Sequence, residues 1–326
     1  IEIENKSKQL IGGYANCTQA GINITDLSQA IVTGNGAGSV VKVDALGVYE
    51  GEVLIRNLIV ANGYSGIFIG SQHSSSYEVI LRNVRLFNNS IGLQVNDLGD
   101  GSSNVVVNDT TIDNNSNGGV LCGGENAEIR IAGDSFIKDN TTLHDGAGIR
   151  AIGGCQMGIY SPVEITNNKA NGNGGGIDVS SGASVNLLSL EGGCQNGVCF
   201  GEWDSPVKLS NNVADFDGNN FGNGGAVYIN GGEASVTIYN ALIEGNQANN
   251  GGAFYVSPAS SLLAAGYQSP ANECWSSGSC LQITGNKALK GGVLQAIGNN
   301  SETIISAASI NENSANDGVI VRLFGD

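Results

Sequence analysis

The feature that most constrains this chain is a short pattern that occurs nine times: Ile or Leu, two further residues, and then Asn. Successive Asn residues lie between 25 and 44 positions apart, the extremes being Asn115 to Asn140 and Asn168 to Asn212. Repetition at this period is typical of solenoids, in which each repeat buries its apolar face against its neighbours. The repeats end at Asn62, Asn89, Asn115, Asn140, Asn168, Asn212, Asn246, Asn286 and Asn313.

A second signal follows each Asn. It is Gly, often doubled, before a small or branched apolar residue, as in Gly118-Gly119-Val120 and Gly175-Gly176-Ile177. Short alternating segments between the two signals, such as Ser235–Ile238, favour strands, and no stretch has helical periodicity. The sequence therefore predicts an all-β, right-handed, single-stranded parallel β-helix of about nine to eleven coils. We assign 1–326 to one domain, with N-terminal coils in 1–52, regular repeats in 53–324, and insertions near 187–206 and 257–280.

The repeated positions have structural explanations. The apolar residue three before each Asn and the apolar residue after each Gly are predicted to point inward. Asn tolerates the left-handed backbone region, and its amide can donate to one coil while accepting from another. We therefore interpret the Asn column as a structural element of the coils rather than as a chemical site.

The motifs resemble those of a known family. Gly224-Gly225-Ala226-Val227 and the Asn-terminated repeats are similar to the motifs of chlamydial polymorphic outer-membrane proteins and of related bacterial autotransporter-like β-helix proteins. This chain has Ile or Leu where that family usually has Phe. The resemblance covers 53–324 and implies a secreted passenger domain, often an adhesin. Because the sequence reads as a coil up to Asp326, we do not expect the family's C-terminal membrane barrel within it.

The two longest insertions each contain a close pair of cysteines, Cys194 with Cys199 and Cys274 with Cys280. We predict that both pairs are disulfides that tie protruding loops, which implies an oxidising compartment. A zinc site would need more Cys or His nearby, and the chain has only His73 and His144. Of the remaining three cysteines, Cys122 is predicted to be a buried thiol, while Cys17 and Cys155 have no assigned role.

Aromatic and acidic residues on the edge that carries these insertions suggest a binding site. Tyr160, Trp203 and Trp275 occupy comparable places in three coils, with Glu202 and Asp204 nearby. An exposed row of this kind suits docking of a carbohydrate or a protein. The alternative is that the rings cap the core beneath their own loops.

One loop suggests a metal site. Asp215, Asp217 and Asn219 place oxygen atoms at alternate positions, as at the start of a calcium loop. The glutamate that would complete such a loop is replaced by Ala226, so a polar turn is the alternative. Calcium is the only cofactor that the sequence suggests.

Charge and missing motifs narrow the function. The net charge of −16 and the scattered Lys and Arg residues argue against nucleic acid as a partner, and no apolar stretch is long enough for a transmembrane helix. The motifs of β-helix enzymes are missing. Arg130, Lys138 and Arg150 have no carboxylate cluster at matched coil positions, and the His144-Asp145 pair lies in a turn.

An enzyme is thus not favoured. The sequence favours a secreted or cell-surface module, adhesin-like or structural, that binds a protein or glycan on a host or neighbouring cell. Two alternatives stay open. One is a polysaccharide lyase or glycoside hydrolase of the β-helix type, whose site could combine residues from distant coils. The other is a fibre subunit that self-associates through the ends of the helix.

Overall fold

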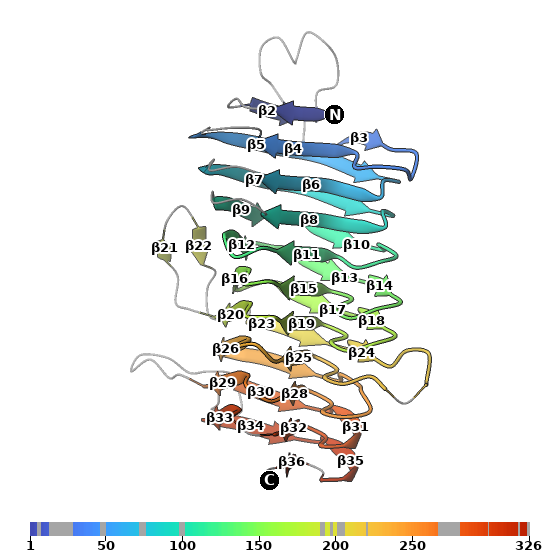
Figure 1. Cartoon of the computed structure of the whole chain (residues 1–326), viewed down its shortest axis with the longest axis vertical. Helices are drawn as coiled ribbons and strands as arrows, with labels where there is room; N and C mark the ends of the chain where they lie inside the picture. Colours follow the sequence, from blue (N-terminus) through green and yellow to red (C-terminus); the bar gives the residue numbers. More distant parts are fainter. Residues whose placement is uncertain are drawn as a thin grey trace.

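The computed structural model describes residues 1–4, 8–12, 29–45, 50–71, 76–97, 102–189, 193–195, 198–200, 206–219, 221–266, 281–298, 300–318 and 320–324. Within these ranges every regular element is a strand, and nearly all strands pair in parallel with the coil before and the coil after. The molecule is a parallel β-helix, drawn with its long axis vertical in Figure 1, so the predicted fold class is confirmed. The described residues contain no helix suited to crossing a membrane.

One face is an eleven-stranded parallel sheet, here called sheet A, which runs down the front of Figure 1. Its strands stack in chain order, one from each coil. They are β1 (Glu2–Glu4), β4 (Val41–Ala45), β6 (Ser65–Ser71), β8 (Ile91–Asp97), β11 (Val120–Gly123), β15 (Ile149–Ile152), β19 (Ile177–Ser180), β25 (Val227–Asn230), β28 (Phe254–Val256), β32 (Leu294–Ile297) and β36 (Val321–Phe324).

The opposite side, sheet B, consists of two parallel ladders that share the long strands β5 (Glu50–Ala61) and β7 (Ser76–Phe87). The first ladder continues through β2 (Lys8–Ile11), β9 (Ser102–Asn108), β12 (Ala127–Ala132), β16 (Gln156–Tyr160), β20 (Ser184–Leu188), β26 (Ser235–Tyr239), β29 (Ser261–Ala265) and β33 (Glu302–Ser306). The second continues through β3 (Ala30–Thr33), β10 (Thr111–Asp113), β13 (Phe136–Lys138), β17 (Glu164–Thr166), β23 (Val207–Ser210), β27 (Ala241–Glu244), β30 (Leu281–Thr284) and β34 (Ala308–Asn311).

A third side carries short strands between sheets B and A. They are β14 (Thr141–Thr142), β18 (Lys169–Ala170) and β24 (Val213–Ala214), followed lower down by β31 (Lys287–Lys290) and β35 (Ser314–Asp317). One insertion adds an antiparallel hairpin, β21 (Gly193–Gln195) with β22 (Val198–Phe200). Strand β22 contacts β12, two coils nearer the N-terminus. The insertion therefore folds back along the rod.

The core is a stack of like residues from successive coils. Ile149 of β15, for example, lies in register with Val120 above and Ile177 below, and all three are at most 1% exposed. The residue three before the repeat Asn is also buried in seven coils, namely Leu86, Ile112, Ile137, Ile165, Leu209, Ile243 and Ile283. Both inward positions predicted from the repeat are thus confirmed in these coils.

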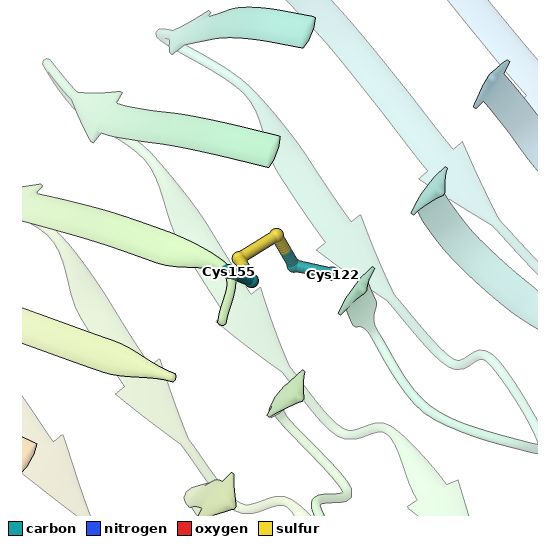
Figure 2. Close-up of a disulfide and its surroundings, with 2 residues drawn as sticks. All are labelled: Cys122 and Cys155. Carbon is teal, nitrogen blue, oxygen red and sulfur yellow. A yellow bond between two sulfur atoms is a disulfide. The ribbon is translucent and has the colours of Figure 1, made fainter. Parts of the chain in front are cut away.

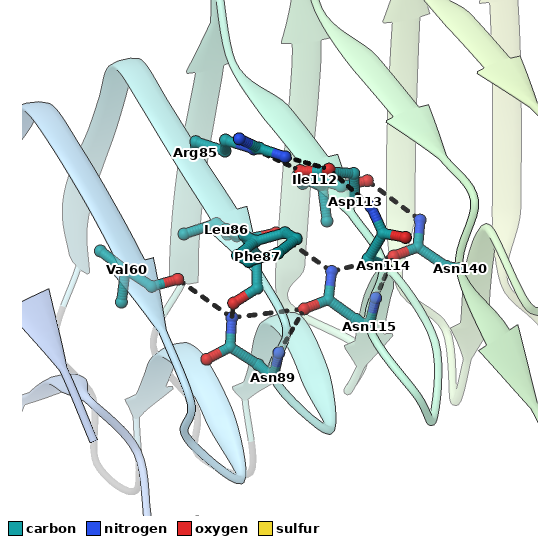
Figure 3. A network of polar contacts seen from close by, with 10 residues as sticks. All are labelled: Val60, Arg85, Leu86, Phe87, Asn89, Ile112, Asp113, Asn114, Asn115 and Asn140. Atoms are coloured by element: carbon teal, nitrogen blue, oxygen red, sulfur yellow. Dashed lines mark hydrogen bonds and ion pairs between the residues drawn. The ribbon is translucent and has the colours of Figure 1, made fainter. Parts of the chain in front are cut away.

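The repeat Asn residues form a continuous buried ladder, part of which is shown in Figure 3. From Asn89 to Asn286, each Asn donates its backbone N–H and its Nδ2 to Oδ1 of the next Asn at 2.9–3.3 Å. The same Nδ2 donates to a backbone carbonyl of the preceding coil, as Asn168 does to Ile137 at 2.9 Å. Each amide therefore joins three coils.

Two details of the predicted Asn column are wrong. Asn62 is outside the ladder: its Oδ1 accepts from the exposed Asn88, and Gly63 N–H donates to Asn89 instead. The pairing of Val60 with Leu86 explains this, because it shifts the first repeat by one residue. The left-handed backbone also belongs to the residue before each ladder Asn, with φ of 54° at Asn114 and 57° at Asn167.

The buried cysteine Cys122 is not a free thiol, as the sequence had suggested. It forms a disulfide with Cys155, whose Cα lies 6.0 Å away, and both side chains are fully buried (Figure 2). Cys122 faces inward from β11, and Cys155 faces inward just before β16 of the next coil. Inward positions on opposite sheets meet across a narrow core, which is why two cysteines that are 33 residues apart can bond.

Of the other predicted cysteine pairs, the structure describes only the backbone of Cys194 and Cys199. The hairpin places the backbone of Cys194 opposite that of Cys199, as a disulfide would need, and the sulfur pairing stays a prediction. Cys274, Cys280 and Cys17 lie outside the described residues.

Replacing Cys122 and Cys155 together by alanine is expected to lower the free energy of unfolding by roughly 3–5 kcal/mol, since it frees a loop of about 33 residues in the unfolded chain and loses core packing. Urea unfolding of the variant and of the parent protein would measure this. A difference below about 1 kcal/mol would show that the bond contributes little to stability.

Candidate functional site

The third side of the rod presents three adjacent columns of residues between β24 and β31. Val213 pairs with Gln247, and Gln247 pairs with Lys287. The next column is Ala214, Ala248 and Ala288, and the one after it is Asp215, Asn249 and Leu289. The middle column is largely buried, with Ala214 and Ala248 at most 6% exposed, and it lies between the two outer columns.

A loop that follows β24 projects from this side of the rod (Figure 1). Together with the three columns it lines an open pocket of about 300 Å³. We call it the loop pocket. Asp215 and Gly218 come from the loop, Gln247 and Lys287 form one wall, and Asn249 and Leu289 form the other, with the three alanines 214, 248 and 288 between them. Pockets that hold small molecules begin at about this size.

Hydrogen bonds fix the overhanging loop. Asp215 has a left-handed backbone with φ of 69°, which turns the chain outward directly after β24. Its Oδ2 accepts from Asn249 Nδ2 at 2.6 Å, and its carbonyl accepts from Gly218 N–H at 3.1 Å. The loop returns where Asn249 N–H donates to the Gly222 carbonyl at 2.9 Å. These contacts connect the loop to the neighbouring coil.

Two phenylalanines stand exposed on the same loop. The side chain of Phe216 is 54% exposed and that of Phe221 is 77% exposed, while Leu289 in the pocket wall is 43% exposed. The Lys169 ammonium lies 4.7 Å from the centre of the Phe216 ring, so this ring is held in place by a cation–π contact. Exposed aromatic rings beside a concave site are typical of binding surfaces.

The oxygens proposed for calcium are engaged within the loop. Asp217 accepts from the backbone N–H and the Nδ2 of Asn219, and Asn219 Oδ1 accepts from Phe221 N–H. In the part of the chain that the structure describes, no three His, Cys, Asp or Glu side chains gather as metal ligands would. These contacts make a polar turn, and calcium binding stays a prediction.

Of the predicted aromatic edge, only Tyr160 lies within the described residues; Trp203, Trp275, Glu202 and Asp204 lie outside them. Tyr160 is half-buried on the outer face of sheet B and packs against the cluster of Val106 and Ala132. The two remaining rings of this edge therefore stay a prediction.

A second polar ladder, which sequence reasoning missed, runs along the corner that leads into sheet A. Asp145 Oδ1 accepts from the backbone N–H and Nδ2 of Asn173, Asn173 Oδ1 accepts from Asn223, and Asn223 Oδ1 accepts from Asn250. Each of these residues directly precedes a glycine with positive φ. The signal in the sequence is Asn-Gly or Asp-Gly at the start of the second repeat motif.

One buried carboxylate near this ladder is poorly satisfied. Asp178 is 1% exposed, and its register neighbour Arg150 donates to its Oδ2 at 3.2 Å, so Arg150 does have a carboxylate at its matched coil position. Among the described residues, no donor reaches Asp178 Oδ1. Burial, together with the negative charge of Asp145, raises the pKa of Asp178 to about 7, and Arg150 opposes this shift.

The raised pKa of Asp178 does not identify an active site. Perturbed carboxylates cluster at catalytic centres, but a catalytic group must also reach its substrate. Both oxygens of Asp178 are shut away from solvent. The neighbouring pocket, which contains His144, Asp145 and Arg150, has a volume of only about 60 Å³. A polysaccharide chain cannot enter it in this conformation.

Comparison with protein-family models, with curated proteins and with solved structures finds no match to this chain.

Proposed function

We propose that the chain is a secreted or cell-surface β-helix that binds a protein or glycan of another cell through the loop pocket and its exposed lip. The lip consists of Phe216 and Phe221. The observation that carries this proposal is the combination of a concave site with two exposed rings on the loop that contributes Asp215 and Gly218 to it. Sites of this kind pair polar groups that orient a ligand with apolar surface that supplies affinity.

Two features support the proposed location outside the cytoplasm. The fully buried disulfide between Cys122 and Cys155 joins two coils of the core, and structural disulfides persist in oxidising compartments. The repeat motifs also resemble those of bacterial autotransporter-like passenger domains, which act at the cell surface. An adhesin-like role follows from that resemblance as an expectation.

Replacing Phe216 and Phe221 together by serine is expected to weaken binding to cells or to an immobilised ligand by about tenfold or more, because the lip loses both anchors. The melting temperature should change little, since both rings are largely exposed. Arrays of glycans and of cell-surface proteins, read with the parent protein and the variant, would measure the effect.

Leu143 supplies a matched control. Its side chain is 75% exposed, and it lies outside the loop pocket. Leu143→Ser removes a comparable exposed apolar group and should leave binding unchanged. If the phenylalanine and leucine variants lose binding equally, or if neither loses it, the lip is not the binding surface.

Two other binding features remain proposals beside this one. The edge that Tyr160, Trp203 and Trp275 would form could add a second docking row, and the loop with Asp217 and Asn219 could bind calcium. Neither is needed for the loop pocket to act. Calcium would have to compete with the hydrogen bonds that Asn219 donates to Asp217.

Self-association is the second candidate function, and one observation favours it. Among the described residues, strand β36 pairs only with β32, and its residues Val321 and Leu323 are 43% and 69% exposed. An unpaired strand edge with apolar side chains can pair with another chain. Light scattering that rises with concentration, and that a Leu323→Asp variant suppresses, would favour a fibre subunit over a monomeric binding module.

A further inference from the structure

We infer that the loop pocket takes a neutral sugar unit of a glycan, held by hydrogen bonds to both walls and by apolar contact with Leu289. This inference rests on the proposed function and specifies the chemistry of its ligand. Four properties of the pocket carry it: the donors on one wall, the acceptor on the other, the balance of charge and the apolar edge.

The first wall supplies hydrogen-bond donors. Lys287 and Gln247 are register partners on neighbouring coils, and both are exposed. Among the described residues, no hydrogen bond or ion pair holds the Lys287 ammonium or the Gln247 side-chain amide. The ammonium offers three donors, and the amide offers both donors and an acceptor. These two groups are therefore available to a ligand without first breaking a contact within the described part of the protein.

The opposite wall supplies a fixed acceptor. The Asp215 carboxylate and the Asn249 amide are planar groups locked together by the 2.6 Å hydrogen bond between them. A hydroxyl group both donates and accepts, so neighbouring hydroxyls of one sugar ring can donate to Asp215 and accept from Lys287 or Gln247. Few other small ligands carry donors and acceptors in equal number around one ring.

The charges at the pocket favour a ligand without net charge. Lys287 and Asp215 contribute one positive and one negative group to its walls. An anionic ligand would be attracted by Lys287, repelled by Asp215, and opposed by the protein's net charge of −16. A cationic ligand would be attracted by Asp215 and repelled by Lys287. A neutral polyhydroxyl ring meets neither penalty.

The apolar edge and the size complete the match. Leu289 and Ala288 give one part of the pocket a surface of C–H groups, against which the C–H face of a sugar ring can pack. The volume of about 300 Å³ accepts a sugar ring but not a folded segment of protein. Phe216 and Phe221 are exposed on the same loop and could contact a further unit of a glycan chain.

The test uses methyl glycosides of the common neutral hexoses, with a hexuronic acid and a hexosamine as charged counterparts. Ligand-observed NMR and calorimetry on the full chain would give the affinities. We expect at least one neutral glycoside to bind, and its affinity to change less than about twofold between about 50 mM and about 500 mM salt, because no net ionic attraction is screened.

Gln247→Ala and Lys287→Ala should each weaken that binding by about tenfold, because each removes donors from the first wall. Gln156→Ala and Lys208→Ala remove the same groups from sheet B and should have no effect. Because Gln247 and Lys287 are both exposed, the folded state should survive both changes, and thermal unfolding would verify this.

The remaining outcomes separate this inference from the proposed function. Tighter binding of the hexuronic acid, lost at high salt, would make the pocket an anion site and overturn the inference. Capture of proteins without any sugar would also overturn it while leaving the binding module intact. If neither glycans nor proteins bind, the proposed function fails as well.

Discussion

Asn168→Ala is expected to lower the free energy of unfolding by roughly 3–5 kcal/mol. The substitution removes four hydrogen bonds, two donated by Asn168 Nδ2 and two accepted by its Oδ1. It leaves the Asn140 backbone N–H and the Ile137 carbonyl without these partners in a buried site, where each unsatisfied group costs about 1–3 kcal/mol.

Asn167 provides the control for that experiment. It directly precedes Asn168, is exposed, and has a left-handed backbone with φ of 57°. Glycine adopts this conformation without strain, so Asn167→Gly should change stability by less than about 1 kcal/mol. Urea unfolding of both variants gives the comparison. A loss at Asn168 no larger than the loss at Asn167 would mean that the ladder does not hold the coils together.

Asp178→Asn is expected to stabilise the protein at about pH 8 by on the order of 2–4 kcal/mol, and to have little effect at about pH 4. The pKa of Asp178 in the folded protein, about 7, lies above its ordinary value of 3.8. The folded state therefore holds a proton that the unfolded state has released between these two pH values. The contribution of Asp178 to stability is fully present below about pH 4 and is lost as the pH rises through about 7.

Asparagine mimics the protonated carboxyl. The variant should therefore be as stable as the parent protein at about pH 4 and more stable than it at about pH 8. Three groups surround Asp178: Arg150, whose ionic pairing exists only in the parent, Asp145, whose repulsion the variant removes, and its register partner Tyr228 on the next coil. Unfolding measured across this pH range for both proteins isolates the one carboxyl. If the two plots of stability against pH run parallel, Asp178 is already ionised at neutral pH in the folded parent protein.

Asp113→Asn should have the opposite sign at about pH 8. This carboxylate is as buried as Asp178, but Arg85 pairs with both of its oxygens at 2.6 and 2.8 Å, and Asn114 adds a further donor (Figure 3). Removing its charge leaves Arg85 without its ionic partner, so the variant should be less stable than the parent protein. Comparing the two variants therefore distinguishes a buried carboxylate with donors to both oxygens, Asp113, from one with an oxygen left without a donor, Asp178.

The sequence predicted those features that recur in every coil. The inward residues such as Ile112 and Ile177 and the donor and acceptor roles of the Asn amides follow from periodicity and from the chemistry of one side chain. The shift at Asn62 could not be predicted, because the repeat motif is still present there and only the pairing of neighbouring strands reveals the offset.

For the same reason, features that depend on contacts between coils could not be predicted from the sequence. The partner of Cys122 is Cys155, and choosing it requires knowing which inward positions meet across the core. The loop pocket combines Asp215, Gln247 and Lys287, whose separations of 32 and 40 residues follow from loops of unequal length. The exposure of Phe216 and Phe221 could not be predicted, because the sequence does not show which loop residues fold back against a neighbouring coil.

Because of the Asn ladder, the distance between neighbouring coils does not depend on the number of residues in a repeat. Asn168 and Asn212 are 44 residues apart and Asn115 and Asn140 only 25, yet the contacts between partners are equally short, at 2.9–3.1 Å. The additional residues leave the rod between β20 and β23 without altering its register. Natural variation, or a protein engineer, can therefore graft a new loop at this corner, or duplicate a whole coil, while the rest of the scaffold keeps its geometry.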